Sequence, residues 1–396
     1  MAYIRKLTQD VTIYDKTRAF NGYTLFAPMS TNDAWLIDMN GNIVHHWSTP
    51  YPPAQHGRLL PDGHLLWPQK AKVPKIPVGG VGSEIVELDW DGKVVWKHED
   101  DTVNHDVRRL PNGNTMYNAY VKVPDSIAAK IQGGIPGTEA NGEIWSSCLR
   151  EVTPDGKIVW EWKMYEHLDP VKDAQCPLCP RSIWGYINSF DVMRDGNIVC
   201  TFRFDNGIGV IEKKTGKVLW RWGSNADVGH PHCVSELENG NFLFFDNGLH
   251  RRSIHRGAHE LSYSRLLEVD PRTEKIVWEY HDPNVFNFYS SICGGVQRLP
   301  NGNTLACEST KGRFFEVTPD KEIVWEYHNP FRVHRSDYWG WTISSCVFQA
   351  HRYPPDYPAF QGKDLSPDKY LWVLQEDPTK VKARIAAFDR LERLGY

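Results

Sequence analysis

Two short patterns of apolar and polar positions alternate along the chain, and both predict β-hairpins. In the first, an Asn-Gly or Asp-Gly pair separates two short apolar runs, as in "HDVRRLPNGNTMY" (105–117) and "HCVSELENGNFLFF" (232–245). Such a pair between apolar runs is the strongest short-range signal for a hairpin. Further copies lie at 56–67, 189–202 and 294–307.

The second pattern is a polar turn followed by β-branched residues and a tryptophan, as in "VTPDGKIVWEWK" (152–163). Its copies recur at intervals of about 47 to 64 residues, the scale of a four-stranded propeller blade with some long loops. We expect the tryptophans of the six copies to pack between blades; they are Trp47, Trp96, Trp160, Trp220, Trp278 and Trp325.

The two ends of the chain supply the missing parts of one blade. The first tryptophan hairpin, at about 23–47, has no hairpin of the first kind before it, and the strand-like run "WTISSCVFQAHRY" (341–353) has none of the second kind after it. Pairing these ends removes the exposed edges of an open array. The sequence therefore predicts an all-β fold, a six-bladed β-propeller closed between its N- and C-terminal strands.

We expect one domain over residues 1–396, with blades at about 20–360 and a helical tail at 361–396. Helical spacing is convincing only at 377–395, where Val381, Ile385, Phe388 and Leu391 form one apolar stripe.

Composition narrows the classes of partner. A formal net charge of −4 argues against a nucleic-acid-binding surface, and no apolar run reaches the length of a membrane span. The first residues lack the apolar core of a secretory signal, so we expect a cytoplasmic protein. Its eight cysteines are scattered, which suits reduced thiols. Association of identical copies stays open.

One pair of cysteines is spaced differently from the rest. Cys176 and Cys179 in "CPLCP" have the C-x-x-C spacing of a zinc half-site or a redox pair. A second C-x-x-C is missing and a proline follows each cysteine. We interpret the stretch as a loop stiffened by proline, in which one local disulfide stays open as an alternative.

Histidines occupy comparable positions in three of the repeats. The residue just before each inner hairpin faces the propeller axis, and these positions hold His56, His105 and His232, with Asn188 and Cys293–Gly294 less securely aligned. Neutral imidazoles there can act as nucleophile or general base. Alternatively, His56, His105 and His232 can bind a divalent metal. Asp106 is placed to orient its neighbour or to line the channel.

Arginines and aromatic residues complete the predicted site. Arg251 and Arg252 follow the strand "FLFFDNG", and Arg203 lies in the related "TFRFDNG". A guanidinium group suits a sulfuryl, phosphoryl or carboxylate group. Walls for an aromatic substrate are expected from Tyr289 and Trp339, with Tyr338 and Trp341 nearby.

Several segments resemble the arylsulfotransferase family of bacterial six-bladed propellers. They are "HDVRRLPNGNTMY", "GHPHCVSELENGNFLFFDNG", "GGVQRLPNGNTLACEST", "GRFFEVTPDKEIVWEYHNPF" and "VFQAHRYPPDYPAF". The resemblance covers most of residues 20–360. It implies transfer of a sulfuryl group between phenols through a covalently sulfated histidine, with no cofactor.

The resemblance also implies roles for individual residues. His105 and His232 match two channel histidines of the family, and Arg251 or Arg252 matches its arginine. The nucleophilic histidine is expected ahead of "QRLPNGNTL", where this chain has Cys293 and Gly294.

Three functions follow as hypotheses. The first is an arylsulfotransferase-like enzyme that acts on a small aromatic, anionic substrate through His105, His232 and His56, with an arginine as anion clamp. The second is a lyase or hydrolase that uses the same histidines, with or without a divalent metal. The third is a propeller that binds a partner without catalysis.

Overall fold

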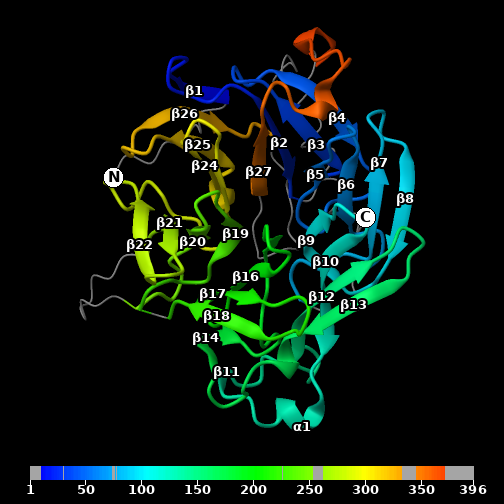
Figure 1. The fold of residues 1–396 in the computed structure, drawn as a ribbon, viewed down its shortest axis with the longest axis vertical. Helices are drawn as coiled ribbons and strands as arrows, with labels where there is room; N and C mark the ends of the chain where they lie inside the picture. Colours follow the sequence, from blue (N-terminus) through cyan, green and yellow to red (C-terminus); the bar gives the residue numbers. More distant parts are fainter. Residues whose placement is uncertain are drawn as a thin grey trace, which may run out of the picture.

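The computed structural model describes residues 10–29, 31–73, 76, 78–224, 226–252, 262–331 and 345–370. Within this part of the chain, six antiparallel sheets stand like blades around a central axis (Figure 1). The predicted all-β, six-bladed propeller is confirmed. The expected helix at 377–395 lies outside the described residues.

The first three blades follow one another along the chain, each from its inner to its outer strand. Blade 1 consists of β5 (Arg58–Leu59), β6 (Leu65–Gln69), β7 (Glu84–Leu88) and β8 (Val94–Glu99). Blade 2 consists of β9 (Val103–Arg109), β10 (Thr115–Lys122), β12 (Trp145–Val152) and β13 (Ile158–Lys163). Blade 3 consists of β15 (Phe190–Val192), β16 (Ile198–Phe202), β17 (Gly207–Ile211) and β18 (Val218–Trp222).

The next two blades repeat this order. Blade 4 consists of β19 (His232–Glu236), β20 (Phe242–Asp246), β21 (Arg265–Asp270) and β22 (Lys275–Tyr280). Blade 5 consists of β23 (Gly295–Arg298), β24 (Thr304–Glu308), β25 (Arg313–Val317) and β26 (Ile323–His328). A strand near the N-terminus, β1 (Asp10–Tyr14), adds a fifth member to its outer edge.

Blade 6 joins the two ends of the chain. Its inner strand β27 (Val347–Tyr353) pairs with β2 (Tyr23–Pro28), which continues to β3 (Asp33–Ile37) and β4 (Ile43–Ser48). Figure 1 shows β27 beside β2, between the N-terminal blue strands and the yellow strands of blade 5. The predicted closure is confirmed.

One excursion interrupts the regular blades. It contains α1 (Asp125–Ala128), β11 (Gly133–Ile135) and β14 (Gln175–Pro180), and its two strands pair in parallel outside the blades. The remaining short helices are η1 (Met164–Glu166), η2 (Ser309–Lys311), η3 (Pro358–Phe360) and η4 (Pro367–Tyr370). Among the described residues, no helix has both the length and the apolar character that crossing a membrane requires.

A ring of tryptophan hydrogen bonds links each blade to the next. In every blade an indole N–H on the outer strand donates to a backbone carbonyl in the outer turn of the following blade, at 2.8 to 3.1 Å. The donors and their acceptors are Trp47 and Asp89, Trp96 and Pro154, Trp160 and Lys213, Trp222 and Glu274, Trp278 and Pro319, and Trp325 and Met39. In blade 3 the donor is Trp222, and Trp220 packs against Phe242 of blade 4, between the blades as predicted.

A second link uses a glutamate on the third strand of a blade. Arg109 and Arg298 end inner strands, and Arg352 is the last residue but one of β27. They pair with Glu87, Glu268 and Glu316 of the preceding blade. The Asn-Gly turns take part, because Asn303 donates to Glu316 at 2.6 Å, within its own blade. The carboxylate therefore joins its own hairpin to the next blade.

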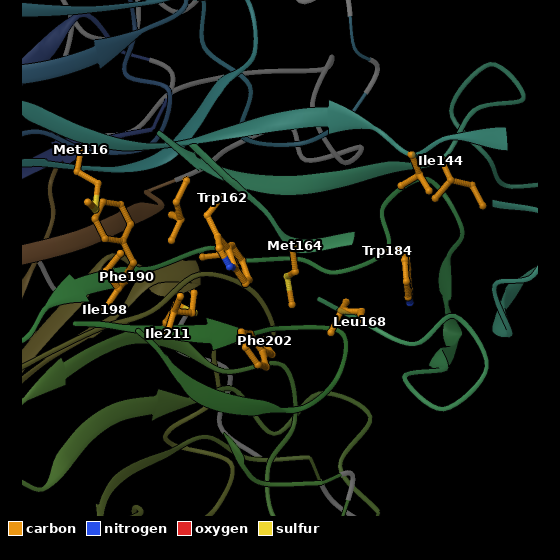
Figure 2. Packing of buried hydrophobic residues seen from close by; sticks show 14 of the residues in the cluster. Met116, Ile144, Trp162, Met164, Leu168, Trp184, Phe190, Ile198, Phe202 and Ile211 are labelled. Atoms are coloured by element: carbon orange, nitrogen blue, oxygen red, sulfur yellow. The ribbon is translucent and has the colours of Figure 1, made fainter. Parts of the chain in front are cut away.

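Apolar side chains fill the space between neighbouring blades. Between blades 2 and 3, Met116, Trp162, Phe190 and Ile198 are at most 3% exposed (Figure 2). Burial of such a side chain stabilises the fold by about 1.5 to 3 kcal/mol.

Substitutions in the Glu316–Arg352 ion pair test how much it stabilises the closure of the propeller. Both side chains are fully buried and the pair joins blade 5 to β27. We expect Arg352→Met to lower the free energy of unfolding by about 3 to 5 kcal/mol, because it leaves a buried carboxylate unpaired. Combining it with Glu316→Gln should cost much less than the sum of the single changes. Urea unfolding of the four proteins measures this coupling, and additive effects would contradict the link.

Candidate functional site

The registers of the five inner hairpins, and of the β27–β2 pair that closes blade 6, define one equivalent position at the start of each inner strand. The pairs next to the turns are Leu59–Leu65, Arg109–Thr115, Val192–Ile198, Glu236–Phe242 and Arg298–Thr304, and the matching pair of blade 6 is Arg352–Thr24. Four residues before the first member of each pair stand Gln55, His105, Asn188, His232, Gly294 and Phe348. His56 is the immediate neighbour of this position in blade 1.

Phe348 of blade 6 lies where the predicted histidines meet. Its ring centroid is 5.3 Å from that of His56, 5.5 Å from that of His105 and 5.9 Å from that of His232. All four side chains are buried. The three histidines therefore converge from blades 1, 2 and 4 on one aromatic ring.

Hydrogen bonds fix the proton of His232 on one ring nitrogen. Asn247 uses its amide N–H groups for the carbonyls of Ser290, at 2.7 Å, and Cys293. Its Oδ1 therefore faces His232 Nδ1, at 2.6 Å, as an acceptor, and the carbonyl of His230 is a second acceptor at 3.1 Å. Nδ1 must carry the proton. Nε2 keeps its lone pair and has no hydrogen-bond partner among the described residues.

His105 is paired with a tyrosine from blade 3. The hydroxyl of Tyr186 lies 3.0 Å from Nε2, and Asn104 Oδ1 lies 3.1 Å from Nδ1. With Asn104 accepting from Nδ1, the Tyr186 hydroxyl donates to Nε2. Gly80 leaves room for the ring, because a Cβ atom there would lie 2.1 Å from its Cε1. Tyr186 precedes its inner strand, and no repeated pattern singles it out.

Burial keeps both histidines neutral, and one arginine adds to the effect. Burial lowers the pKa of His105 to about 3, and it holds the pKa of His232 well below its usual range. The next largest cause for both is the positive charge of Arg203. The guanidinium group of Arg203 lies over the rings of Tyr186 and Phe204. No described carboxylate forms an ion pair with it.

His56 also belongs to a second group, which contains a buried carboxylate. Its Nε2 is 3.4 Å from Asp106 Oδ1, and burial lowers its pKa to about 4. Asp106 is fully buried and also pairs with Arg58, at 3.2 Å, and with Arg108. Asp106 thus binds two arginines rather than orienting His105.

The other predicted substrate-binding residues form contacts of their own, away from those of His105 and His232. Arg251 pairs with the buried Asp246 and stacks on Tyr263, while Arg252 is exposed. Tyr289 is half-buried, and its backbone N–H donates to Glu308. Trp339 lies outside the described residues, as do Tyr338 and Trp341. Of the three predicted arginines, Arg203 is the one whose charge is a main cause of the lowered pKa values of His105 and His232.

The backbone explains why blade 5 has no histidine at the axis. Gly294 has a φ of +144°, and a Cβ atom there would lie 2.5 Å from a ring carbon of Phe245. A side chain at this position would displace Phe245 from the core. Cys293, the preceding residue, is buried, and its carbonyl accepts from Asn247.

Two cysteines and two histidines form a separate cluster, and the charge of Arg203 acts on two of its members, Cys179 and His230. Within the described residues, two groups bring three or more potential ligand atoms within 4.8 Å of one another: Cys176, Cys179, His230 and His250, and Asp62, His64 and Glu87. Neither group contains His56, His105 or His232. In the second group Glu87 is already paired with Arg109. The sequence had shown Cys176 and Cys179 but not which histidines face them.

Comparisons with known proteins agree with this fold. The profile of the arylsulfotransferase (ASST) family matches residues 15–331. A search of curated proteins gives no match. Among solved structures, the chain is similar to a protein of unknown function from Bacteroides caccae, at 13% identity and a TM-score of 0.52, over 84% of this chain and 98% of that one. A streptogramin B lyase follows at 14% identity and a TM-score of 0.47, over 87% of this chain and 94% of that one. These structural likenesses concern the fold alone.

The buried histidines make stability depend on pH. A histidine in the unfolded chain has a pKa of about 6.5, so at pH 5 it binds a proton that the folded His56 and His105 do not bind. Each therefore lowers the free energy of unfolding by up to about 1.4 kcal/mol per pH unit as the pH falls below about 6.5. We expect His56→Gln to flatten this fall between pH 6.5 and pH 4.5, measured by urea unfolding. A variant that loses stability as steeply as the parent would rule this out.

Proposed function

Because the chain belongs to the arylsulfotransferase family, we propose that it transfers the sulfuryl group of an aryl sulfate to a phenol where His105, His232, Tyr186 and Arg203 meet. The observation that carries this proposal is the fixed proton of His232. An imidazole with its proton held on Nδ1 and a free Nε2 lone pair is a nucleophile at neutral pH.

In the first half-reaction, His232 Nε2 attacks the sulfur atom. The N–S bond forms as the bond between sulfur and the aryl oxygen breaks, and the phenolate leaves with the electron pair. Asn247 and the carbonyl of His230 stabilise the positive charge that develops on the ring, since both accept from Nδ1. The adduct is a sulfated histidine.

In the second half-reaction, a phenol takes the sulfuryl group from His232. Its proton passes to the Tyr186 oxygen while the Tyr186 proton passes to His105 Nε2, and His105 returns it to solvent. The oxygen–sulfur bond forms and the nitrogen–sulfur bond breaks, which restores His232. The negative charge of the bound sulfuryl group opposes the effect of Arg203 and raises the pKa of His105 during this step.

Arg203 is the proposed anion clamp. Its planar guanidinium group suits two sulfuryl oxygens at once. Its charge reaches both His105 and His232, as their pKa shifts indicate. Arg251, which the family resemblance favours together with Arg252, is already bound to Asp246.

The role of His232 is tested with p-nitrophenyl sulfate and a phenol acceptor. We expect nitrophenol release in the parent and a loss of at least about 10³-fold in His232→Ala, as for removal of a nucleophile. Mass spectrometry of the parent, quenched without acceptor, should find one sulfuryl group on the peptide that contains His232. The matched control, His281→Ala at an exposed histidine, should keep parental activity.

Each alternative gives a different result in this assay. Release that needs no acceptor and leaves free sulfate identifies a hydrolase. No release with any phenol, or full activity in His232→Ala, contradicts the proposal.

Two substitutions test the anion clamp and the proton relay separately. We expect Arg203→Met to lower kcat/KM for the aryl sulfate by about 10²- to 10³-fold, because it removes the positive charge that faces the sulfuryl oxygens. Tyr186→Phe should lower kcat by about 10²-fold or more with weakly acidic phenols, and less with acidic ones. Arg272→Met, at a side chain that is 74% exposed, is the control. Equal losses for all phenols in Tyr186→Phe would contradict the proton relay.

A further inference from the structure

The C-x-x-C pair of the excursion faces two histidines of blade 4. Cys176 and Cys179 lie on β14, His230 precedes β19 and His250 follows β20. Cys176 Sγ is 3.4 Å from His250 Nδ1, and Cys179 Sγ is 3.5 Å from His230 Nε2 and 3.6 Å from His250 Nδ1. The four atoms lie within 4.8 Å of one another.

These separations match a common tetrahedral ion. Zinc binds sulfur at about 2.3 Å and imidazole nitrogen at about 2.0 to 2.1 Å. Two such ligands at a tetrahedral angle lie about 3.6 Å apart. Pairwise hydrogen bonding explains the group less well, because Cys179 has two imidazole neighbours and carries a single thiol proton.

We propose that Cys176, Cys179, His230 and His250 form a structural zinc site. Two thiolates and two imidazoles in a tetrahedral arrangement favour zinc over magnesium, calcium or manganese, which prefer oxygen ligands. Four protein ligands leave no open position for a substrate, which is typical of a structural site. All eight cysteines are free thiols, so no disulfide competes for Cys176 or Cys179.

The surroundings support a closed site. Cys176 and Cys179 are each 3% exposed and His230 is fully buried. Ile76, Val81, Tyr120, Ile183, Tyr186 and Phe204 pack in the same cluster as the cysteines and shield them from water. His230 and His250 have φ angles of +56° and +58°, an uncommon conformation for non-glycine residues, and both rings face the cysteines.

A zinc ion here would hold in place one side of the site formed by His105 and His232. Within the described residues, β14 has only β11 as a strand partner, so the ion would tie the excursion to blade 4. His230 stands two residues before His232, and its backbone carbonyl accepts a hydrogen bond from His232 Nδ1. This assignment does not rest on the proposed sulfotransfer, since a structural site needs no reaction.

Metal analysis of the tag-free full chain, purified under reducing conditions, tests the assignment. We expect one zinc per chain by mass spectrometry, and loss of at least nine-tenths of it in Cys176→Ser and in Cys179→Ser. The matched control is Cys148→Ala, which changes a buried cysteine of blade 2 outside the cluster and should keep one zinc.

A second measurement covers variants that fail to fold. Cobalt(II) added to the parent chain after zinc removal should give the visible absorption of a tetrahedral site with thiolate ligands, and added zinc should abolish it. Removal of zinc by a chelator should lower the Tm. A disulfide between Cys176 and Cys179 without metal, unchanged zinc in both serine variants, or an octahedral cobalt spectrum would each overturn the proposal.

Discussion

The hydrogen bonds between blades are the constraint on which the rest of this structure depends. A single four-stranded blade has two faces to bury, so it is stable only between two neighbours. The indole N–H of Trp325 reaches the carbonyl of Met39 at 2.8 Å and continues this contact across the chain ends. Glu316 and Arg352 cross the same boundary as a fully buried ion pair. Closure leaves each blade in one orientation about the axis.

That orientation determines what meets at the centre. Every inner strand begins at the same end of the propeller, so residues far apart in sequence share one small space. His105 and His232 face Phe348 there, together with Tyr186 and the charge of Arg203. Arg108, which lies three residues after His105 on β9, forms an ion pair with Asp106. The axis therefore carries a histidine group near the start of the inner strands and an ion-pair group beyond it.

The sequence predicted the fold because the local structural preferences of the repeated residues agree with a propeller. Asn-Gly turns specify hairpins, and the tryptophans recur at blade spacing. It did not show that Trp222 rather than Trp220 donates to blade 4, because both lie on one short strand and only packing selects between them. The positions of His105 and His232 were also predictable, because symmetry places equivalent residues at the axis, and His56 lies one residue away from the equivalent position of its blade.

The sequence by itself determined the architecture, its closure and the convergence of three histidines. Only the tertiary structure decided which nitrogen of His232 carries the proton, because this depends on Asn247 and on the carbonyls it binds. Only the tertiary structure likewise singled out Arg203 from the three candidate arginines. It also identified the two histidines that face Cys176 and Cys179. Repeats fix where strands begin, whereas these contacts are made by loops of different length. Loop residues have no repeating pattern, so their partners follow only from the folded chain.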